Sequence, residues 1–269
     1  MSPWVRSVRA ALGRAYPRLV GSNRDRAWLF YDTVLPLLGS VALVYVYRSL
    51  GAPDHLVAYA IMGGAAMAFW MNVLWSMAAQ FYWDKMAGNL ELYMVVPCGL
   101  VPILLGMSLG GAVATLLRAG LIVAAGSLLF GVPLPVRDLG LFLAVFAVAL
   151  VALYGLGVTF ASAFLLWGRE AWHTANLFME PVFLLSGFYF PVRALGFWTA
   201  AAASLIPLTL ALDALRQLMF GPLHPAFLPV HVELWLLVGL AAAFALAARA
   251  SLRRMEHLAR REGRLSLRF

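Results

Sequence analysis

Long uncharged runs divide the chain into six predicted membrane-spanning helices. A helix that crosses a bilayer needs about 20 consecutive apolar residues, and two runs, residues 56–83 and 139–168, contain no charged side chain. Four other apolar runs hold only one or two ionisable residues each: 27–47, 92–136, 176–192 and 228–248. This pattern predicts an all-α integral membrane protein with six transmembrane helices per chain.

One further apolar stretch, residues 194–212, is ambiguous. It carries no charge, but Pro207 interrupts it, and Asp213 and Arg216 follow at once. It is compatible with a seventh span, or with two short helices that enter the membrane and return. Non-helical backbone is tolerated at membrane depth only where protein or water shields it.

The basic residues decide between these arrangements, because cytoplasmic loops of membrane proteins carry an excess of Lys and Arg. Six arginines lie in residues 1–26 and seven in residues 249–269, so both termini are expected in the cytoplasm. Two termini on one side require an even number of spans. With six spans, fifteen basic residues lie inside, and only four lie outside: Arg48, Arg137, Arg193 and Arg216. We therefore predict a multi-pass protein of the inner (cytoplasmic) membrane.

The N-terminal segment, residues 4–20, has the spacing of an amphipathic helix. One face carries apolar side chains and the other carries arginines: Val5, Val8, Leu12, Ala15, Tyr16 and Leu19 against Arg6, Arg9, Arg14 and Arg18. Such a helix lies in the headgroup plane with its apolar face toward the lipid; the alternative is a solvated basic tail. The whole chain, 1–269, is then one transmembrane domain, with this helix in 1–26, the bundle in 27–248 and a basic tail in 249–269.

Composition and charge agree with this class. The chain is 63% hydrophobic and only 12% charged, whereas soluble domains carry about 25% charged residues. This excludes a soluble enzyme, a disordered chain and a disulfide-rich secreted module. The net charge of +8 would suggest nucleic acid in a soluble protein. Here it indicates contact with anionic membrane lipids, and no nucleic-acid partner is expected.

The loop after the second predicted span is the most informative internal segment. Residues 80–97 place Asp84, Lys85 and Glu91 between long apolar spans, with apolar and polar side chains alternating at helical spacing. An ordinary polar loop with aromatic interface anchors is one interpretation. The segment is longer than a plain turn requires, which favours a short helix on the cytoplasmic surface that meets a partner.

Two motifs give the chain its resemblance to a known family. Residues 84–91 read Asp-Lys-Met-Ala-Gly-Asn-Leu-Glu and are followed by Pro97; the second motif, Ser-Gly-Phe-Tyr-Phe-Pro at 186–191, is followed by Pro207, Asp213 and Arg216. In their order and spacing they resemble the permease subunits of ABC-2 type ABC transporters, although Asn89 stands where that family usually has threonine.

The resemblance implies three structural features: an elbow helix at 4–20, a coupling helix near 82–92 and two re-entrant outer helices near 195–220. The residues that it implies for coupling to an ATPase are Trp83, Asp84, Lys85, Gly88, Asn89, Leu90 and Glu91. Those that it implies for an outer gate are Phe188, Tyr189, Phe190, Pro191, Pro207, Asp213 and Arg216. Asp213 and Arg216 lie three residues apart, so they are expected to share one helix face, and a local ion pair is the simpler interpretation.

The chain contains no Gly-x-x-x-x-Gly-Lys-Ser/Thr P-loop, so we expect ATP hydrolysis on a separate polypeptide. The resemblance then implies ABC ATPase (nucleotide-binding) subunits that hold ATP and Mg, and a second permease protomer, identical or homologous. It favours export of an amphipathic cargo: a lipid, glycoconjugate, polysaccharide or drug-like molecule. A stand-alone channel or a secondary transporter is the alternative, although no internal repeat supports it.

Ionisable side chains inside the spans are further candidates, because charges are rare at membrane depth. Arg118 in the third span is able to pair with Glu180 in the fifth, facing the bundle; a purely structural ion pair or an arginine that snorkels to the interface is the alternative. Asp32 is expected to cap its helix or to pair with Arg26 or Lys85. With five scattered histidines and one cysteine, we predict no catalytic residues, no metal site and no cofactor within this chain.

The charge bias makes the topology testable. Reporter domains fused after residue 269 and inserted at Arg137 are expected to report opposite sides of the membrane, because fifteen of the basic residues are assigned to the cytoplasmic side. Activity of both reporters on the same side would contradict the six-span arrangement.

Overall fold

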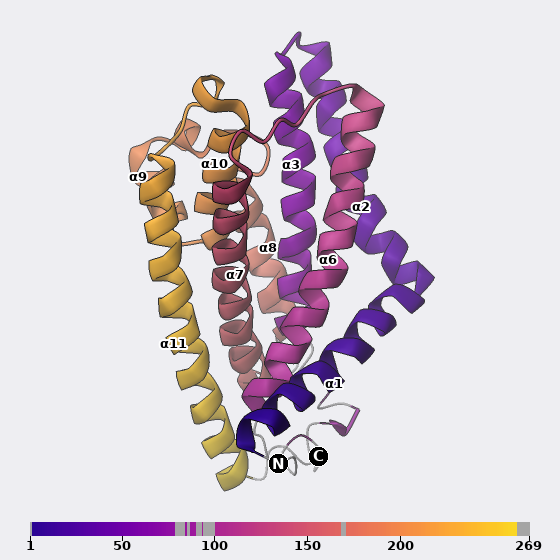
Figure 1. Cartoon of the computed structure of the whole chain (residues 1–269), viewed down its shortest axis with the longest axis vertical. Coiled ribbons are helices and arrows are strands. Elements are labelled where there is room, and N and C mark those ends of the chain that lie inside the picture. The colour runs from indigo at the N-terminus through magenta and orange to yellow at the C-terminus, as the bar shows by residue number, and fades with distance from the viewer. Residues whose placement is uncertain are drawn as a thin grey trace.

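The computed structural model describes residues 2–78, 84, 87–89, 93, 100–167 and 171–262, and every regular element within these residues is helical (Figure 1). The longer helices are α1 (Pro3–Arg24), α2 (Arg26–Ser49), α3 (Asp54–Met71), α6 (Leu100–Phe130), α7 (Leu139–Trp167), α8 (Ala171–Leu185) and α11 (Val230–Glu262). The shorter elements are η1 (Asn72–Ala78), η3 (Val192–Leu195), α9 (Phe197–Ala203), α10 (Pro207–Phe220) and η4 (Gly221–Leu223).

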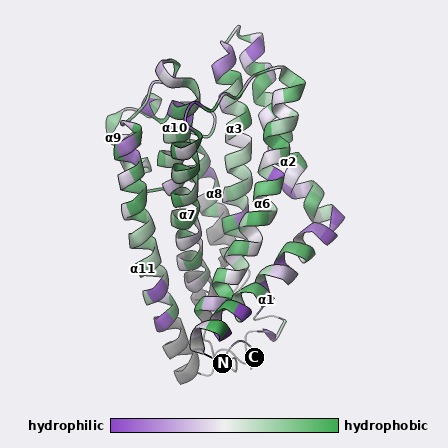
Figure 2. Ribbon diagram, viewed as in Figure 1, coloured by the Kyte–Doolittle hydropathy of each residue, from purple (hydrophilic) through white to green (hydrophobic). Residues whose placement is uncertain are grey.

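Within the described residues, five helices are long and apolar enough to cross a membrane, and they confirm the predicted all-α membrane class. These candidate spans are Leu29–Ser49, Asp54–Leu74, Val101–Phe130, Leu139–Ser162 and Val230–Arg254. The second of them, built on α3, is the central one, because most of its side chains are buried by the surrounding helices. In Figure 2 the middle of the bundle is mostly hydrophobic, and hydrophilic residues gather toward its two ends.

The fifth predicted span, residues 176–192, has different bounds in the structure. Helix α8 begins at Ala171 and ends at Leu185, and residues 186–190 form a turn instead of continuing the helix. The break lies at Gly187, whose φ of 65° belongs to the left-handed region that glycine tolerates best.

The ambiguous stretch after it folds as two helices, as predicted. Helices α9 and α10 meet at an angle of 111° across a short break, and Pro207 is the first residue of α10. Proline suits this first position because its missing N–H has no helical partner there. A bend of this size rules out one straight crossing, so the predicted break at Pro207 is confirmed.

Helix α1 is confirmed as a continuous helix, but its faces differ from the prediction. Ser2 caps it by accepting a hydrogen bond from the backbone N–H of Val5. Trp4, Leu12 and Tyr16 are exposed. Arg14 and Arg18, which were expected on the solvated face, are instead packed partly inside the protein, and burial together with the nearby Arg14 lowers the pKa of Arg18.

The inner face of α1 packs closely on α6, and two glycines permit the approach. A Cβ atom on Gly106 would lie 2.2 Å from the carbonyl oxygen of Ala11, and one on Gly110 would lie 2.5 Å from that of Ala15. Small residues four apart allow helix backbones to approach in this way. The Gly-x-x-x-Gly spacing at 106–110 is therefore explained by the packing of α1.

The start of α1 and the end of α11 lie at the same end of the bundle (Figure 1). This agrees with the even number of passes that the charge bias predicts, although among the described residues only α2, α3, α6, α7 and α11 are candidate spans. We call the end that holds α1 the inner end and the opposite one, with α9 and α10, the outer end.

Candidate functional site

At the outer end, Arg216 of α10 joins three parts of the chain. Its guanidinium donates hydrogen bonds to the carbonyl oxygens of Gly187 (2.6 Å), Phe188 (2.5 Å) and Phe190 (3.2 Å) in the turn that follows α8. It also donates to the carbonyl oxygen of Tyr59 on α3 at 3.4 Å and lies 4.5 Å from the centre of that tyrosine ring. Arg216 is 1% exposed, so these acceptors replace water.

The turn itself packs against α3 and α2. A Cβ atom on Gly63 would lie 2.1 Å from the carbonyl oxygen of Phe188, so glycine is required where the turn meets α3. The Tyr47 hydroxyl donates to the carbonyl oxygen of Tyr189 at 2.7 Å. Burial raises the pKa of the Tyr189 phenol, and its hydroxyl points to the Met67 sulfur at 3.6 Å. Phe188 and Tyr189 thus belong to a fixed structure between helices.

Asp213 and Arg216 lie three residues apart on α10, as expected, but Asp213 has other partners in place of an ion pair with Arg216. Its carboxylate accepts from the His224 ring at 2.9 Å, the Phe227 backbone N–H at 2.9 Å and the Gln217 amide at 3.2 Å. The other His224 ring nitrogen contacts the Tyr59 hydroxyl. Asp213 therefore holds the connection from α10 to α11, while Arg216 holds the turn after α8.

Gln217 extends this buried network to α11. Its amide nitrogen donates to the Leu228 carbonyl oxygen at 2.7 Å and to a Glu233 carboxyl oxygen at 2.9 Å. Glu233 lies in the first turn of α11 and is fully buried. The predicted outer-gate residues Phe188, Tyr189, Phe190, Asp213 and Arg216 therefore come together at the outer end.

Sequence reasoning missed four members of this outer cluster: Tyr59, Gln217, His224 and Gly63. Tyr59 and Gly63 lie in a long uncharged run, where nothing distinguishes them from other span residues. Gln217 and His224 could have been found from the sequence, because they are polar side chains close to Asp213 in an otherwise apolar part of the chain.

Within the bundle, Arg118 pairs with Asp32, which corrects the pairing considered for Arg118 and Glu180. The guanidinium of Arg118 on α6 donates to the carboxylate of Asp32 on α2, and both side chains are largely buried. Glu180 is exposed on α8. Arg26 and Lys85 were the expected partners of Asp32. Arg26 is exposed, so that prediction is wrong, and Lys85 lies outside the described residues.

A second polar contact lies deep in the bundle. The Tyr154 hydroxyl of α7 donates to the Asn72 side-chain oxygen at 3.0 Å, and both residues are buried. Asn72 begins η1, a seven-residue π-helix that continues α3. Inserted π-helical turns are frequent at functional sites, and this one leads directly into the predicted coupling segment.

At the inner end, Asp84 of the predicted coupling segment is held by α1. Arg14 donates to its two carboxyl oxygens at 3.1 and 3.3 Å, and the Tyr93 hydroxyl donates at 3.1 Å. The Arg14 guanidinium also lies 5.4 Å from the centre of the Tyr93 ring. Burial and the neighbouring Asp84 charge raise the pKa of Tyr93 to about 12, so this hydroxyl remains a donor at neutral pH.

The other predicted coupling residues are described only in part. Gly88 has a φ of 73°, a left-handed conformation that favours glycine, and Asn89 follows it. Trp83, Lys85, Leu90 and Glu91 lie outside the described residues. Among the described residues, no group of three or more His, Cys, Asp or Glu side chains could hold a metal ion.

The helical bundle, its five apolar spans and its buried charges define the class as a multi-pass integral membrane protein. The chain matches the family described as ABC-2 type transporter over residues 21–220, which include α2, the predicted coupling segment and α10. It therefore belongs to that family, as its motifs predicted, and is a permease subunit of an ABC transporter. No curated protein matches the chain.

The Asp32–Arg118 pair gives a stability prediction. Asp32→Asn removes the carboxylate that pairs with a buried guanidinium, so it should lower the free energy of unfolding by about 3–5 kcal/mol. The double variant with Arg118→Met should cost less than the sum of the two single changes, as measured by unfolding in detergent. Glu180→Gln, on an exposed carboxylate, is the control and should change stability by less than about 0.5 kcal/mol. Equal effects of the Asp32 and Glu180 variants would contradict the assignment.

Proposed function

We propose that this permease exports an amphipathic molecule, such as a lipid, glycoconjugate, polysaccharide or drug, across the cytoplasmic membrane. Separate ABC ATPase subunits, which bind ATP and Mg, drive it, and a second permease protomer completes the pathway. Membership in the ABC-2 type transporter family supports the transport class. The absence of a P-loop in residues 1–269 supports ATP hydrolysis on another chain.

The observation that carries this proposal is the attachment of Asp84 to α1. Asp84 is 3% exposed and accepts hydrogen bonds from Arg14 and Tyr93. A movement of the segment around Asp84, imposed by an ATPase below it, is then passed to α1 and through Gly106 and Gly110 to α6. Asp84 is thus joined to α1 by a buried ion pair, which supports a role of this segment in coupling to an ATPase.

At the other end of the bundle, α9, α10 and the turn after α8 are proposed as the outer gate. They join α3 through Arg216, the connection before α11 through Asp213, and α11 itself through Gln217. Tilting of the spans would change the position of this outer layer as a unit. In this proposal, ATP binding favours one arrangement of the spans and release of hydrolysis products favours the other.

The proposal is tested by purifying the permease together with the P-loop ATPase encoded beside it, in lipid nanodiscs. We expect a stable complex whose ATP hydrolysis responds to the permease. Arg14→Glu and Asp84→Arg should each lower the permease-coupled hydrolysis about tenfold or more, because a charge-assisted hydrogen bond contributes about 1.5–3 kcal/mol. The exchange of both charges in one chain should restore much of it.

Arg6→Glu makes the same charge change on an exposed part of α1 and serves as the matched control, with coupling close to wild type. If no complex and no stimulation of hydrolysis appear in any lipid mixture, the proposed function is wrong. If the complex forms but both single charge variants couple normally, the attachment of α1 to Asp84 is not the coupling route.

A further inference from the structure

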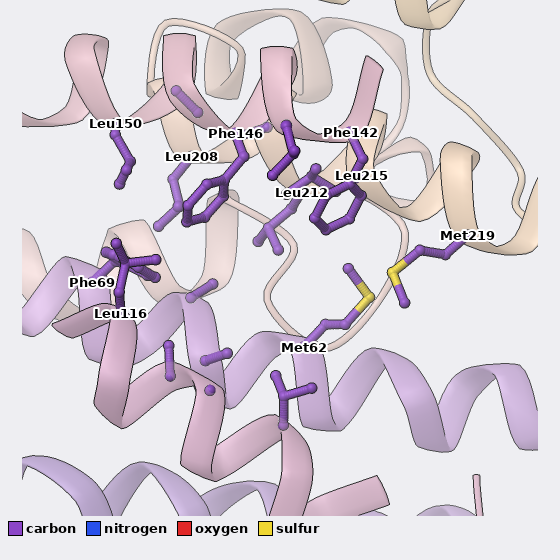
Figure 3. A pocket seen from close by; sticks show the side chains of 18 of the residues that line it. Met62, Phe69, Leu116, Phe142, Phe146, Leu150, Leu208, Leu212, Leu215 and Met219 are labelled. Atoms are coloured by element: carbon purple, nitrogen blue, oxygen red, sulfur yellow. The ribbon is translucent and has the colours of Figure 1, made fainter. Parts of the chain in front are cut away.

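A cavity of about 430 Å³ lies within the single chain, between α3, α6, α7 and α10. Figure 3 shows Met62 and Phe69 from α3, Phe146 from α7, and Leu212 and Met219 from α10 directed into it. This cavity is separate from the outer cluster and from the segment around Asp84. None of the residues named above for coupling or for the outer gate lines it.

The lining of the cavity selects the kind of molecule that fits. All of its lining residues are aliphatic, aromatic, glycine or methionine, so no side chain offers a charge or a hydrogen bond to a ligand. A sugar, a headgroup or an ion would lose its water there without compensation. A saturated hydrocarbon chain meets only favourable contacts.

The volume also fits one hydrocarbon chain. An engineered apolar cavity of about 150 Å³ holds one benzene, a six-carbon molecule. By the same ratio, a cavity of about 430 Å³ has room for roughly seventeen carbon atoms. This is the size of a common phospholipid acyl chain.

The cavity opens toward the lipid between α6 and α7. Leu116 on α6 and Leu143 on α7 line it, yet they are 40% and 54% exposed on the outside of the bundle. These helices pack mainly on other neighbours, α6 on α1 and α3, and α7 on α11. Both are candidate membrane spans, so the surroundings of this mouth are hydrocarbon, and acyl chains are the abundant molecules there.

We propose that this cavity binds one acyl chain of a bilayer phospholipid, which enters between α6 and α7 and packs against α10. An empty apolar cavity of this size lowers the stability of the helices around it, and a bound acyl chain restores that stability by filling the cavity. The inner end of the acyl chain contacts Leu208, Leu212 and Leu215. Asp213 and Arg216 lie among these positions on the same helix, so the bound lipid holds the outer layer in place.

Gly120 provides the means of testing the site. It lines the cavity on α6, and a Cβ atom built on it would meet no atom within 4 Å. Gly120→Phe therefore fills the mouth without a clash in the helix packing. Gly239 on α11 is equally open and exposed but lies away from the cavity, so Gly239→Phe is the matched control.

The experiment uses the permease alone, in nanodiscs of phosphatidylcholine that carries a photoreactive diazirine near the end of an acyl chain of about sixteen carbons. Labelled peptides are identified by mass spectrometry. We expect labelling of α10 at 208–219, at least about tenfold weaker in Gly120→Phe and unchanged in Gly239→Phe. A phospholipid with a much shorter labelled chain should reach α6 and α7 but not α10.

Several results would overturn the proposal. One is labelling confined to the outer faces of α6 and α7, identical in wild type and Gly120→Phe. Another is labelling of α10 by a free fatty acid but not by the phospholipid. A third is cross-linking of the Gly120→Cys variant through residue 120 to a second copy of the chain, in place of lipid labelling.

Two features keep the test decisive. If Gly120→Phe elutes as misfolded protein, Leu143→Trp narrows the same mouth from the α7 side and must give the same loss of α10 labelling. No ATPase is present, so the labelling does not depend on ATP-driven export.

Discussion

The outer half of this permease depends on one requirement, that backbone carbonyls near the membrane be hydrogen-bonded without water. The chain leaves helical geometry after Leu185 and resumes it only at Val192. Arg216 meets the requirement by donating to three carbonyl oxygens of that turn and to one on α3. Because the same side chain belongs to α10, the turn, the central helix and the bent pair α9–α10 form one unit. The close contact at Gly63 exists because this unit packs directly on α3.

The same principle, that a charge in an apolar bundle is paired, orders the remainder of the molecule. Arg118 and Asp32 join α6 to α2, and Arg14 and Asp84 join α1 to the predicted coupling segment. Between the two ends, the described part of the bundle is filled mainly by apolar packing, which also encloses the Arg118–Asp32 pair, the Tyr154–Asn72 contact and the cavity beside α10. The molecule therefore has two polar layers, one at each end, that apolar helices connect, which is an arrangement suited to passing motion between an ATPase and an outer gate.

The sequence predicted the class, five of the spans and the break at Pro207 because these features follow from local composition: apolar runs, arginine bias and proline chemistry. It also placed Phe188, Asp213 and Arg216 together, although only through the family resemblance. It did not give their partners, because a hydrogen bond from Arg216 to backbone oxygens leaves no side-chain signature in the chain. Arg118 pairs with Asp32 and not with Glu180 because of the way in which α2, α6 and α8 turn their faces toward one another. The sequence periodicity of uniformly apolar helices does not reveal which face of a helix points inward. The end of α8 at Leu185 was missed for a similar reason, since the apolar residues continue past it into the turn.

The central claim is that Arg216 fixes the outer layer through backbone carbonyls, and hydrogen exchange of backbone amides in nanodiscs tests it most directly. Arg216→Met keeps the bulk of the side chain but removes every donor, and Arg193→Met, on an exposed arginine, is the control. The account predicts that amides in 186–190 and 207–220 of the Arg216 variant exchange at least about tenfold faster. Amides of α7 and α11 and those of the control should remain unchanged. Unaltered protection of the turn and of α10 in Arg216→Met would contradict the account.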